Sequence, residues 1–150
     1  MSTSTNASSA TTSGTSGPTR AGSGACSVRF DDSRRPITVY TFEGEFTGPD
    51  LNAMFRQSEA ILRRGRHALV MDMRRLGGMS ALLRHQVAEW NVANAVALGE
   101  RRAGLAMVIT DSRERGIITA IYWHNPPPYP YLICESVAEA LAWCNQKLAP

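Results

Sequence analysis

A catalytic trio for nucleophilic attack needs a serine, a histidine that takes the serine proton, and an acid that orients the imidazole. The sequence offers these residue types at Ser80, His85 and Asp72. A chain of 150 residues offers such trios by chance, and His85 falls on the predicted helix away from its apolar stripe. The sequence lacks the phosphate-binding, dinucleotide-binding, zinc-protease and nucleophile-elbow motifs. We therefore expect no enzyme activity.

Cysteine and histidine are the usual ligands of structural metals, and here they do not fall at ligand spacing. The cysteines are Cys26, Cys134 and Cys144, with no Cys-x-x-Cys pair. Cys134 lies in an apolar strand-like run and Cys144 on the apolar stripe of a helix, so both are expected to be small core residues. The sequence predicts no metal, no cofactor and no disulfide framework.

The charge pattern argues against a nucleic-acid or membrane-spanning protein. The formal net charge is +3 and the isoelectric point is about 9.0, but the paired arginines are scattered over several predicted elements. Scattered pairs do not make one phosphate-binding stripe, so we predict no nucleic-acid binding. No apolar run is long enough to span a bilayer and no secretory signal opens the chain, which predicts a cytoplasmic protein.

Composition divides the chain into two parts. Residues 1–27 are almost entirely Ser, Thr, Gly, Ala, Asn and Pro, with too little apolar surface to offset the entropy of ordering. We expect this segment to be a disordered tail. Residues 28–148 have the length and hydrophobic content of one globular domain.

Periodicity and capping residues predict the order of elements in that domain. Runs at 27–30 and 37–46, joined by a turn at 31–36, are expected to pair as an antiparallel hairpin. The four later helices begin at Thr47, Ser80, Asp111 and Ser136, which are residue types that cap helix N-termini. We expect helices from 47 to Gly65, 80 to Gly99, 113 to 124 and 136 to 148, strands at 67–73, 103–110 and 131–134, and a loop at Gly77–Gly78.

The helix at 113–124 is apolar on most sides and is expected to be largely covered by other elements. Strands that alternate with helices predict right-handed crossovers and parallel pairing. The result is an α/β domain with one mixed, mostly parallel sheet of four or five strands and about four helices, in the order β-β-α-β-α-β-α-β-α.

That order resembles the STAS fold of bacterial anti-sigma-factor antagonists, and more closely its SpoIIAA-like branch, which is related to CRAL-TRIO lipid-binding modules. The local similarities are the strand 68–73 with Asp72 near its end, Ser80 opening the next helix, and a proline-rich break followed by Ser136-x-x-Glu139-Ala140-x-x-Trp143. The resemblance covers residues 28–148. It implies a bacterial, regulatory, non-enzymatic module that binds a protein partner.

The resemblance also points to a phosphorylation position. In typical antagonists the loop after the central strand holds Asp-Ser, and a partner kinase phosphorylates that serine. Here Ser80 stands near that place, with Met79 in place of the acid. Ser80 is thus either a phosphorylation site or only a helix cap. A phosphate would be favoured at a helix N-terminus, and Arg74 and Arg75 could pair with it.

A second candidate surface surrounds the proline-rich break. Trp123, His124, Tyr129 and Tyr131 flank Pro126–Pro128, and aromatic side chains beside a rigid turn can anchor a partner or line a pocket. The alternative is that Trp123 belongs to the core and the prolines only end the helix.

Two hypotheses of function remain open. The first is a regulatory protein-interaction module of STAS type. The second is a module that binds a lipid or another small apolar ligand between the helices and the sheet. Dimerisation through a sheet edge or a helix face is compatible with either hypothesis.

Overall fold

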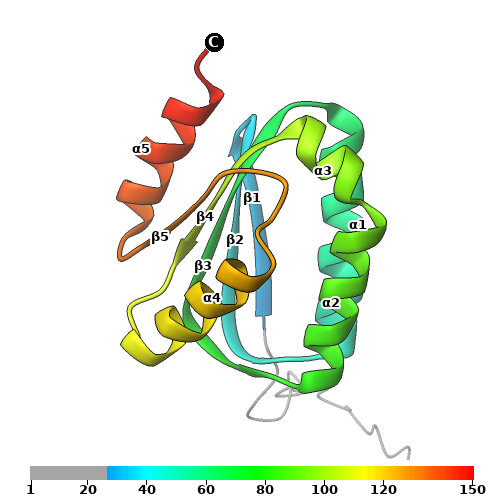
Figure 1. The fold of residues 1–150 in the computed structure, drawn as a ribbon, viewed down its shortest axis with the longest axis vertical. Coiled ribbons are helices and arrows are strands. Elements are labelled where there is room, and N and C mark those ends of the chain that lie inside the picture. Colours follow the sequence, from blue (N-terminus) through cyan, green and yellow to red (C-terminus); the bar gives the residue numbers. More distant parts are fainter. Residues whose placement is uncertain (1–26) are drawn as a thin grey trace, which may run out of the picture.

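The computed structural model describes residues 27–150, and the segment predicted to be a disordered tail lies almost wholly outside these residues. These residues form five strands and five helices: an opening hairpin of two strands is followed by three strands that alternate with helices, and two of the helices are consecutive (Figure 1). Their bounds are β1 (Ser27–Arg34), β2 (Ile37–Phe46), α1 (Gly48–Arg64), β3 (His67–Met79), α2 (Ala81–Ala93), α3 (Ala95–Arg101), β4 (Arg102–Val108), α4 (Ser112–His124), β5 (Tyr131–Cys134) and α5 (Val137–Leu148).

The strands form one sheet in the order β1-β2-β3-β4-β5. β1 and β2 are antiparallel, and the other three pairs are parallel. This confirms the α/β class and the mixed, mostly parallel sheet. The buried runs of β3 and β4 are apolar on both sides, as expected for parallel strands covered by helices on both faces.

Two cores lie on opposite faces of this sheet. On one face α5 covers β3, β4 and β5, and the core includes Cys134, Ala140 and Cys144. The other face is covered by α1, α2, α3 and part of α4 (Figure 1), around a core that includes Tyr40 and Leu98. The expectation that Cys134 and Cys144 are core residues is confirmed, since both are buried.

β3 continues through the Gly77–Gly78 pair that was predicted to be a loop. The long strand β2 supplies a partner for this extension, with Glu45 opposite Gly78 and Phe46 opposite Met79. Gly77 comes so close to Gly44 that a Cβ would lie 3.1 Å from the Gly44 carbonyl carbon, and Gly78 has a φ of +147°. Here the glycines allow an irregular strand pairing rather than a loop.

β1 is also longer than predicted, because residues 31–34 extend the strand and leave a two-residue turn. The register shifts between Asp31 and Arg34, which marks a bulge. The Asp31 carboxylate accepts a hydrogen bond from the Ser33 amide at 2.9 Å within this irregular part. Asp and Ser residues, whose side chains form local hydrogen bonds of this kind, are also common in turns. The sequence therefore predicted a turn for this segment.

The helix predicted from Ser80 to Gly99 is two helices, so the domain has five helices rather than about four. Asn94 ends α2, and its side-chain amide donates to the Trp90 carbonyl at 2.8 Å, which competes with the helical hydrogen bonds. α3 then passes Gly99 and ends at Arg101. Gly99 lies at a close approach instead, since a Cβ there would be 3.3 Å from the Pro128 side chain.

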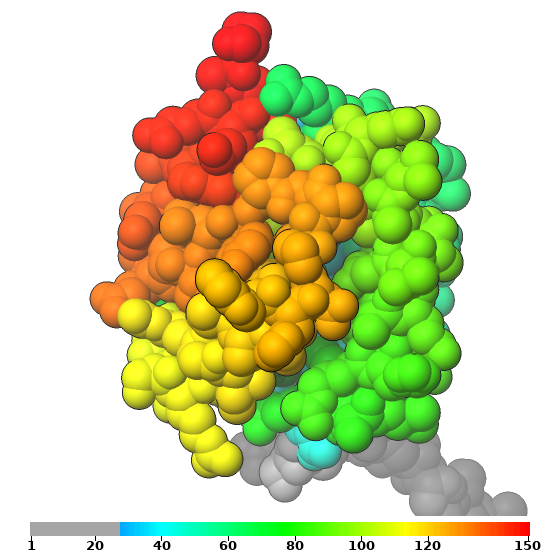
Figure 2. Space-filling model, in the orientation of Figure 1, coloured from blue at the N-terminus to red at the C-terminus, as the bar shows by residue number. Residues whose placement is uncertain are grey.

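The expectation that other elements largely cover α4 is wrong, because no residue of this helix is fully buried. Ile118 and Tyr122 pack on the sheet, whereas Ile117, Ile121 and Trp123 are exposed. In the orientation of Figures 1 and 2, no other element lies in front of α4. The apolar composition of this helix therefore marks a surface.

Candidate functional site

Ser80 stands at the junction of β3 and α2, at the carboxyl end of the parallel strands. Its extended backbone (φ −64°, ψ 158°) turns the chain into the helix, and its hydroxyl oxygen accepts a hydrogen bond from the Leu83 amide at 3.3 Å. The residue is exposed. The junction therefore presents a hydroxyl group beside amides at the positive end of a helix dipole.

The two arginines proposed to pair with a phosphate are held by carboxylates. Arg74 makes a two-point contact with Asp72, Nε to Oδ1 at 2.9 Å and Nη2 to Oδ2 at 2.8 Å. These hydrogen bonds hold the pKa of the Asp72 carboxyl below its usual value. Arg75 lies 3.8 Å from Glu43 and is otherwise exposed.

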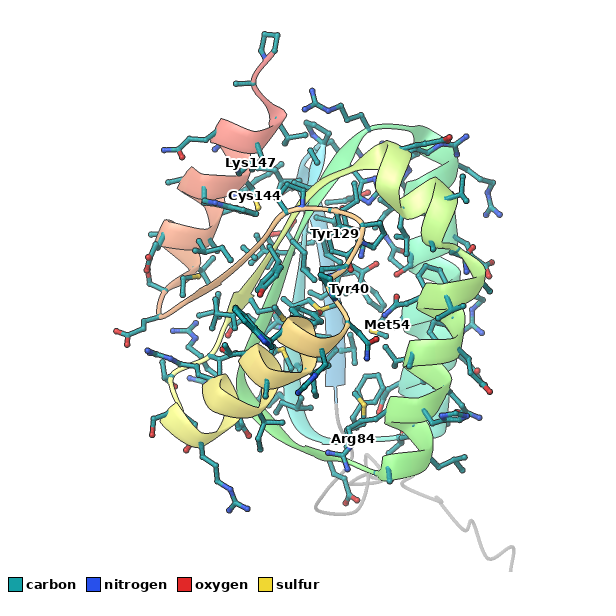
Figure 3. All side chains as sticks on the ribbon, in the orientation of Figure 1. Tyr40, Met54, Arg84, Tyr129, Cys144 and Lys147 are labelled. Carbon is teal, nitrogen blue, oxygen red and sulfur yellow. The ribbon has the colours of Figure 1, made fainter. Side chains whose placement is uncertain are left out.

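A third arginine lies nearer to Ser80 along the chain. Arg84 donates its backbone amide to the Ser80 carbonyl at 3.1 Å, in the first turn of α2. Its side chain projects at the lower end of the domain in Figure 3, beside the start of the helix. Sequence reasoning missed Arg84, although its spacing of four residues from Ser80 is the signal that would have found it.

The nucleophilic trio is not assembled. Ser80 caps its helix, Asp72 binds Arg74, and His85 lies 3.0 Å from Glu89 on the exposed side of α2. Each of the three side chains thus has a separate structural partner. Among residues 27–150 no cluster of His, Cys, Asp or Glu is arranged to hold a metal ion.

The outer side of α2 carries apolar residues that the sequence analysis did not single out. Leu83, Val87 and Trp90 pack inward, and the Trp90 ring stacks on Phe55 of α1 at 5.4 Å between centroids. Leu82 and Val92 fall on the opposite side of the helix and are 67% and 78% exposed. His85 and Glu89, whose Nε2 and Oε1 atoms lie 3.0 Å apart, fall between them along the helix. We call these four residues the outer face of α2.

The residues around the proline-rich break separate into two environments. Trp123 is 82% exposed, and it lines a shallow depression along α4 together with His124 and Gly116. Tyr131 is 36% exposed, and its ring lies edge-to-face against the Tyr122 ring with 4.7 Å between the centroids. Trp123 is therefore a surface residue.

Tyr129, in contrast, is buried to 8% exposure and belongs to the core (Figure 3). Its hydroxyl oxygen accepts a hydrogen bond from Arg102 Nη1 at 3.4 Å, and the Arg102 guanidinium lies over the ring at 5.0 Å from the centroid. A side chain so enclosed does not contribute to a surface that a partner could contact.

Arg102 joins Tyr129 to a buried histidine. Arg102 Nε donates to His67 Nε2 at 3.3 Å, and His67 Nδ1 lies 3.0 Å from the Gly65 carbonyl oxygen. Burial, and to a lesser degree the positive charge of Arg102, lower the pKa of His67 to about 4. The imidazole is therefore neutral near pH 7 and serves as a hydrogen-bond partner within the core.

Solved structures with the same arrangement of elements settle the fold. A protein of the DUF3478 family with a SpoIIAA-like fold from Shewanella loihica PV-4 superposes with a TM-score of 0.59, over 81% of this chain and 94% of that protein, at 16% identity. This chain has a SpoIIAA-like fold. An anti-sigma factor antagonist from Mycobacterium paratuberculosis superposes with a TM-score of 0.53, over 81% of this chain and 95% of that protein, at 14% identity.

The resemblance seen in the sequence is confirmed at the level of the fold. No protein-family model matches this SpoIIAA-like chain, and no curated protein matches it by sequence. Across residues 27–150, none of the helices combines the length and the apolar character needed to cross a bilayer.

Proposed function

We propose that this chain is a regulatory protein-interaction module without enzyme activity, and that it binds its partner through the outer face of α2 and the Ser80 junction. One observation carries the proposal: Leu82 and Val92 are exposed on the side of α2 away from the sheet, and Leu82 follows Ser80 by two residues at the carboxyl end of the parallel strands. Exposed apolar residues on a rigid helix are typical anchors for a partner.

The polar residues on this face favour a protein partner with both apolar and polar contacts. His85 Nε2 lies 3.0 Å from Glu89 Oε1 between the two apolar residues, so the centre of the face is polar. A partner could cover this face with an apolar surface that has a polar middle. The polar middle would gain specificity from hydrogen bonds to the imidazole and the carboxylate.

The structural neighbours support a regulatory role. An anti-sigma factor antagonist has the same fold, and the proposal carries over its class of activity, which is binding to another protein. A bacterial source and a cytoplasmic location belong to the same proposal. The separate engagement of Ser80, His85 and Asp72 supports the absence of hydrolytic chemistry.

Ser80 is proposed as the point of regulation. A phosphate on its exposed hydroxyl would lie at the N-terminus of α2, where the free amides and the helix dipole favour negative charge. Arg84 follows four residues later, and Arg74 and Arg75 could reach the phosphate only by leaving Asp72 and Glu43. The phosphate would add negative charge directly beside Leu82 and so weaken apolar docking there.

The alternative of a lipid or another apolar ligand has lost its main support. Its motivation was an apolar helix enclosed against the sheet, whereas α4 leaves Ile117, Ile121 and Trp123 exposed. We retain it as the second hypothesis without assigning it a cavity.

Affinity purification of the full chain from its own host tests the proposal. Wild type is compared with a Leu82→Glu/Val92→Glu variant, and with Gln146→Glu on the exposed side of α5 as the matched control. We expect a protein that wild type and control retain and that the double variant retains at least about 10-fold less, as for loss of interface anchors.

Direct titration of that purified protein against the domain, with Ser80→Asp as a phosphate mimic, must then reproduce the difference and show weaker binding of the mimic. Equal retention by wild type and the double variant would rule out the outer face of α2 as the docking surface. Retention of no protein at all would rule out the interaction module.

A further inference from the structure

We propose that the end of the domain formed by the amino ends of the parallel strands binds the phosphate backbone of a double-stranded nucleic acid, without reading its sequence. In the sequence the paired arginines are scattered over several predicted elements, which predicted no nucleic-acid binding. In the folded domain three of the four pairs lie at this one end. The surface is distinct from the outer face of α2, so the proposal goes beyond the proposed function.

The arginines are brought together because they precede neighbouring strands. The segments 32–36, 63–66 and 100–101 lead directly into β2, β3 and β4, which are parallel neighbours in the sheet. The amino ends of parallel neighbours lie side by side, at the upper end of the domain in Figure 1. Six exposed arginines lie in these segments, and we call them the arginine end: Arg34, Arg35, Arg63, Arg64, Arg66 and Arg101.

Contacts made by the arginines join the segments into one surface. Arg64 Nη1 lies 3.3 Å from Asp32 Oδ2, which connects the end of α1 to the turn between β1 and β2. Arg101 Nη1 donates to the Leu62 carbonyl at 2.7 Å, which connects the end of α3 to the end of α1. Among residues 27–150, the other two nitrogens of the Arg101 guanidinium make no hydrogen bond. They therefore remain free to donate to a ligand.

The protein does not neutralise the positive charge of the arginine end. Two carboxylates, Asp32 and Glu100, lie in the three segments, and Asp32 is shared by Arg35 and Arg64. Across the part of the chain that the structure describes, no carboxylate lies within 4 Å of three of the others, which are Arg34, Arg63 and Arg66.

The charge of the whole chain is unevenly distributed as a result. Of its 16 basic and 13 acidic side chains, six and two lie in the three segments, which leaves ten and eleven for the rest. The net charge of +3 therefore comes entirely from this end. A concentrated positive charge of this kind attracts a polyanion over a long range.

Three helices also end here, and they do not cancel the excess. α1, α3 and α5 each carry a basic residue in the last turn, as the helix dipole favours. A helix carboxyl end is equivalent to roughly half a negative charge, so six arginines still exceed two carboxylates and three helix ends. Arg66 Nη2 donates to the Lys147 carbonyl at 2.8 Å, at the end of α5. Contacts of this kind hold the guanidinium groups in place before a ligand binds.

The side chains that this end lacks select a nucleic-acid duplex over other polyanions. Membrane-binding surfaces insert apolar side chains, and surfaces for single strands stack the bases on aromatic rings. Within residues 27–150, none of the exposed large apolar side chains falls in the three segments. Guanidinium groups bind phosphate oxygens with two hydrogen bonds, and a duplex presents one phosphate charge per about 1.7 Å of its axis. Such a surface contacts the backbone and leaves the bases unread.

Fluorescence anisotropy of a labelled DNA duplex of about two helical turns, titrated with the full chain, tests the proposal. We expect a dissociation constant on the order of 1–10 µM at roughly 50 mM salt, as for sequence-independent binding. About four phosphate contacts predict that raising the salt to roughly 200 mM weakens binding on the order of 100-fold. A duplex of unrelated sequence should bind equally well.

Two double variants remove the same charge from different places. Arg34→Gln/Arg63→Gln in the arginine end should weaken binding at least about 10-fold and lower the salt slope by about two. Arg29→Gln/Arg113→Gln, at exposed positions outside the three segments, is the matched control and should bind nearly as tightly as wild type. All four residues are exposed, so both variants should keep the circular dichroism of wild type.

No binding of the duplex by wild type at the lower salt concentration would overturn the proposal. Equal losses in the two double variants would also overturn it, because binding would then depend on net charge rather than on this end. Tighter binding to a single strand of the same length, or binding only to vesicles of equimolar phosphatidylcholine and phosphatidylserine, would identify another occupant and refute the duplex. None of these results bears on partner binding through α2, so the two proposals fail separately.

Discussion

Replacing Gly104 with alanine should destabilise the domain, because α5 packs directly on this position of β4. A Cβ at Gly104 would lie 2.7 Å from Cζ3 and 2.8 Å from Cη2 of the Trp143 ring, and 3.4 Å from Cγ of Lys147. Carbon atoms in contact are normally about 3.5–4.0 Å apart. The ring would therefore have to move by nearly 1 Å, away from the core shared by α5 and the sheet.

The magnitude follows from two opposing effects. Overpacking a filled site costs about 1–3 kcal/mol. Replacing glycine with alanine also restricts the unfolded chain, which returns about 0.4–1 kcal/mol. The net loss in the free energy of unfolding should be about 1–2 kcal/mol, which lowers the urea midpoint by roughly 0.5–1 M for an ordinary denaturant slope.

Equilibrium urea unfolding followed by circular dichroism is the assay. Gly48→Ala at the start of α1 is the matched control, since a Cβ there meets nothing within 4 Å. It should be neutral or slightly stabilising. The same Gly104→Ala change should cost much less in a Trp143→Ala background, because the clashing ring is then absent.

An unchanged midpoint for Gly104→Ala would refute the packing argument. An equal loss in both backgrounds would also refute it, because the cost would then not arise from the contact with Trp143.

Three further changes test other parts of the fold. Ser80→Ala removes the hydroxyl cap of α2 and should lower the free energy of unfolding by about 1 kcal/mol, measured by urea unfolding. Tyr40→Phe leaves the buried Ser58 hydroxyl without its partner at 3.0 Å and should cost about 1–2 kcal/mol, most of which Tyr40→Phe/Ser58→Ala should recover in thermal melts. Because the pKa of His67 falls to about 4 in the folded state, against an ordinary value of 6.5, the folded protein binds fewer protons than the unfolded chain between these values. Stability should therefore be complete above pH 6.5 and fall by roughly 1–3 kcal/mol as the pH drops towards 4. Urea midpoints at neutral and mildly acidic pH should show a steeper loss for wild type than for His67→Gln, and equal slopes would contradict the assignment.

Local signals in the sequence were enough for most element positions. Ser136 and Asp111 accept hydrogen bonds from the amides three residues later, so the capping pattern located the starts of α5 and α4. The apolar stripe of α5, which includes Ala140 and Cys144, is the stripe that packs on the sheet. Caps and periodicity depend on residues within one or two turns, so the sequence contains them in full.

Contacts between distant residues could not be derived in this way. The Gly77–Gly78 pair looked like a loop, and only the length of β2 made it part of a strand. Tyr129 and Trp123 looked alike beside the prolines, yet Arg102 holds Tyr129 in the core while Trp123 remains on the surface.

The sequence by itself thus determined the class of fold, the order of its elements and the apolar strands and helix stripes that form the core, because these follow from local propensity and periodicity. Only the tertiary structure decided which apolar side chains are buried. α4 has the composition of a buried helix, but it contacts the sheet through Ile118 and Tyr122 only on one side, and no other element closes over the rest. Burial depends on what packs against a residue from elsewhere in the chain, so the exposed surfaces of α2 and α4 became visible only in the folded domain.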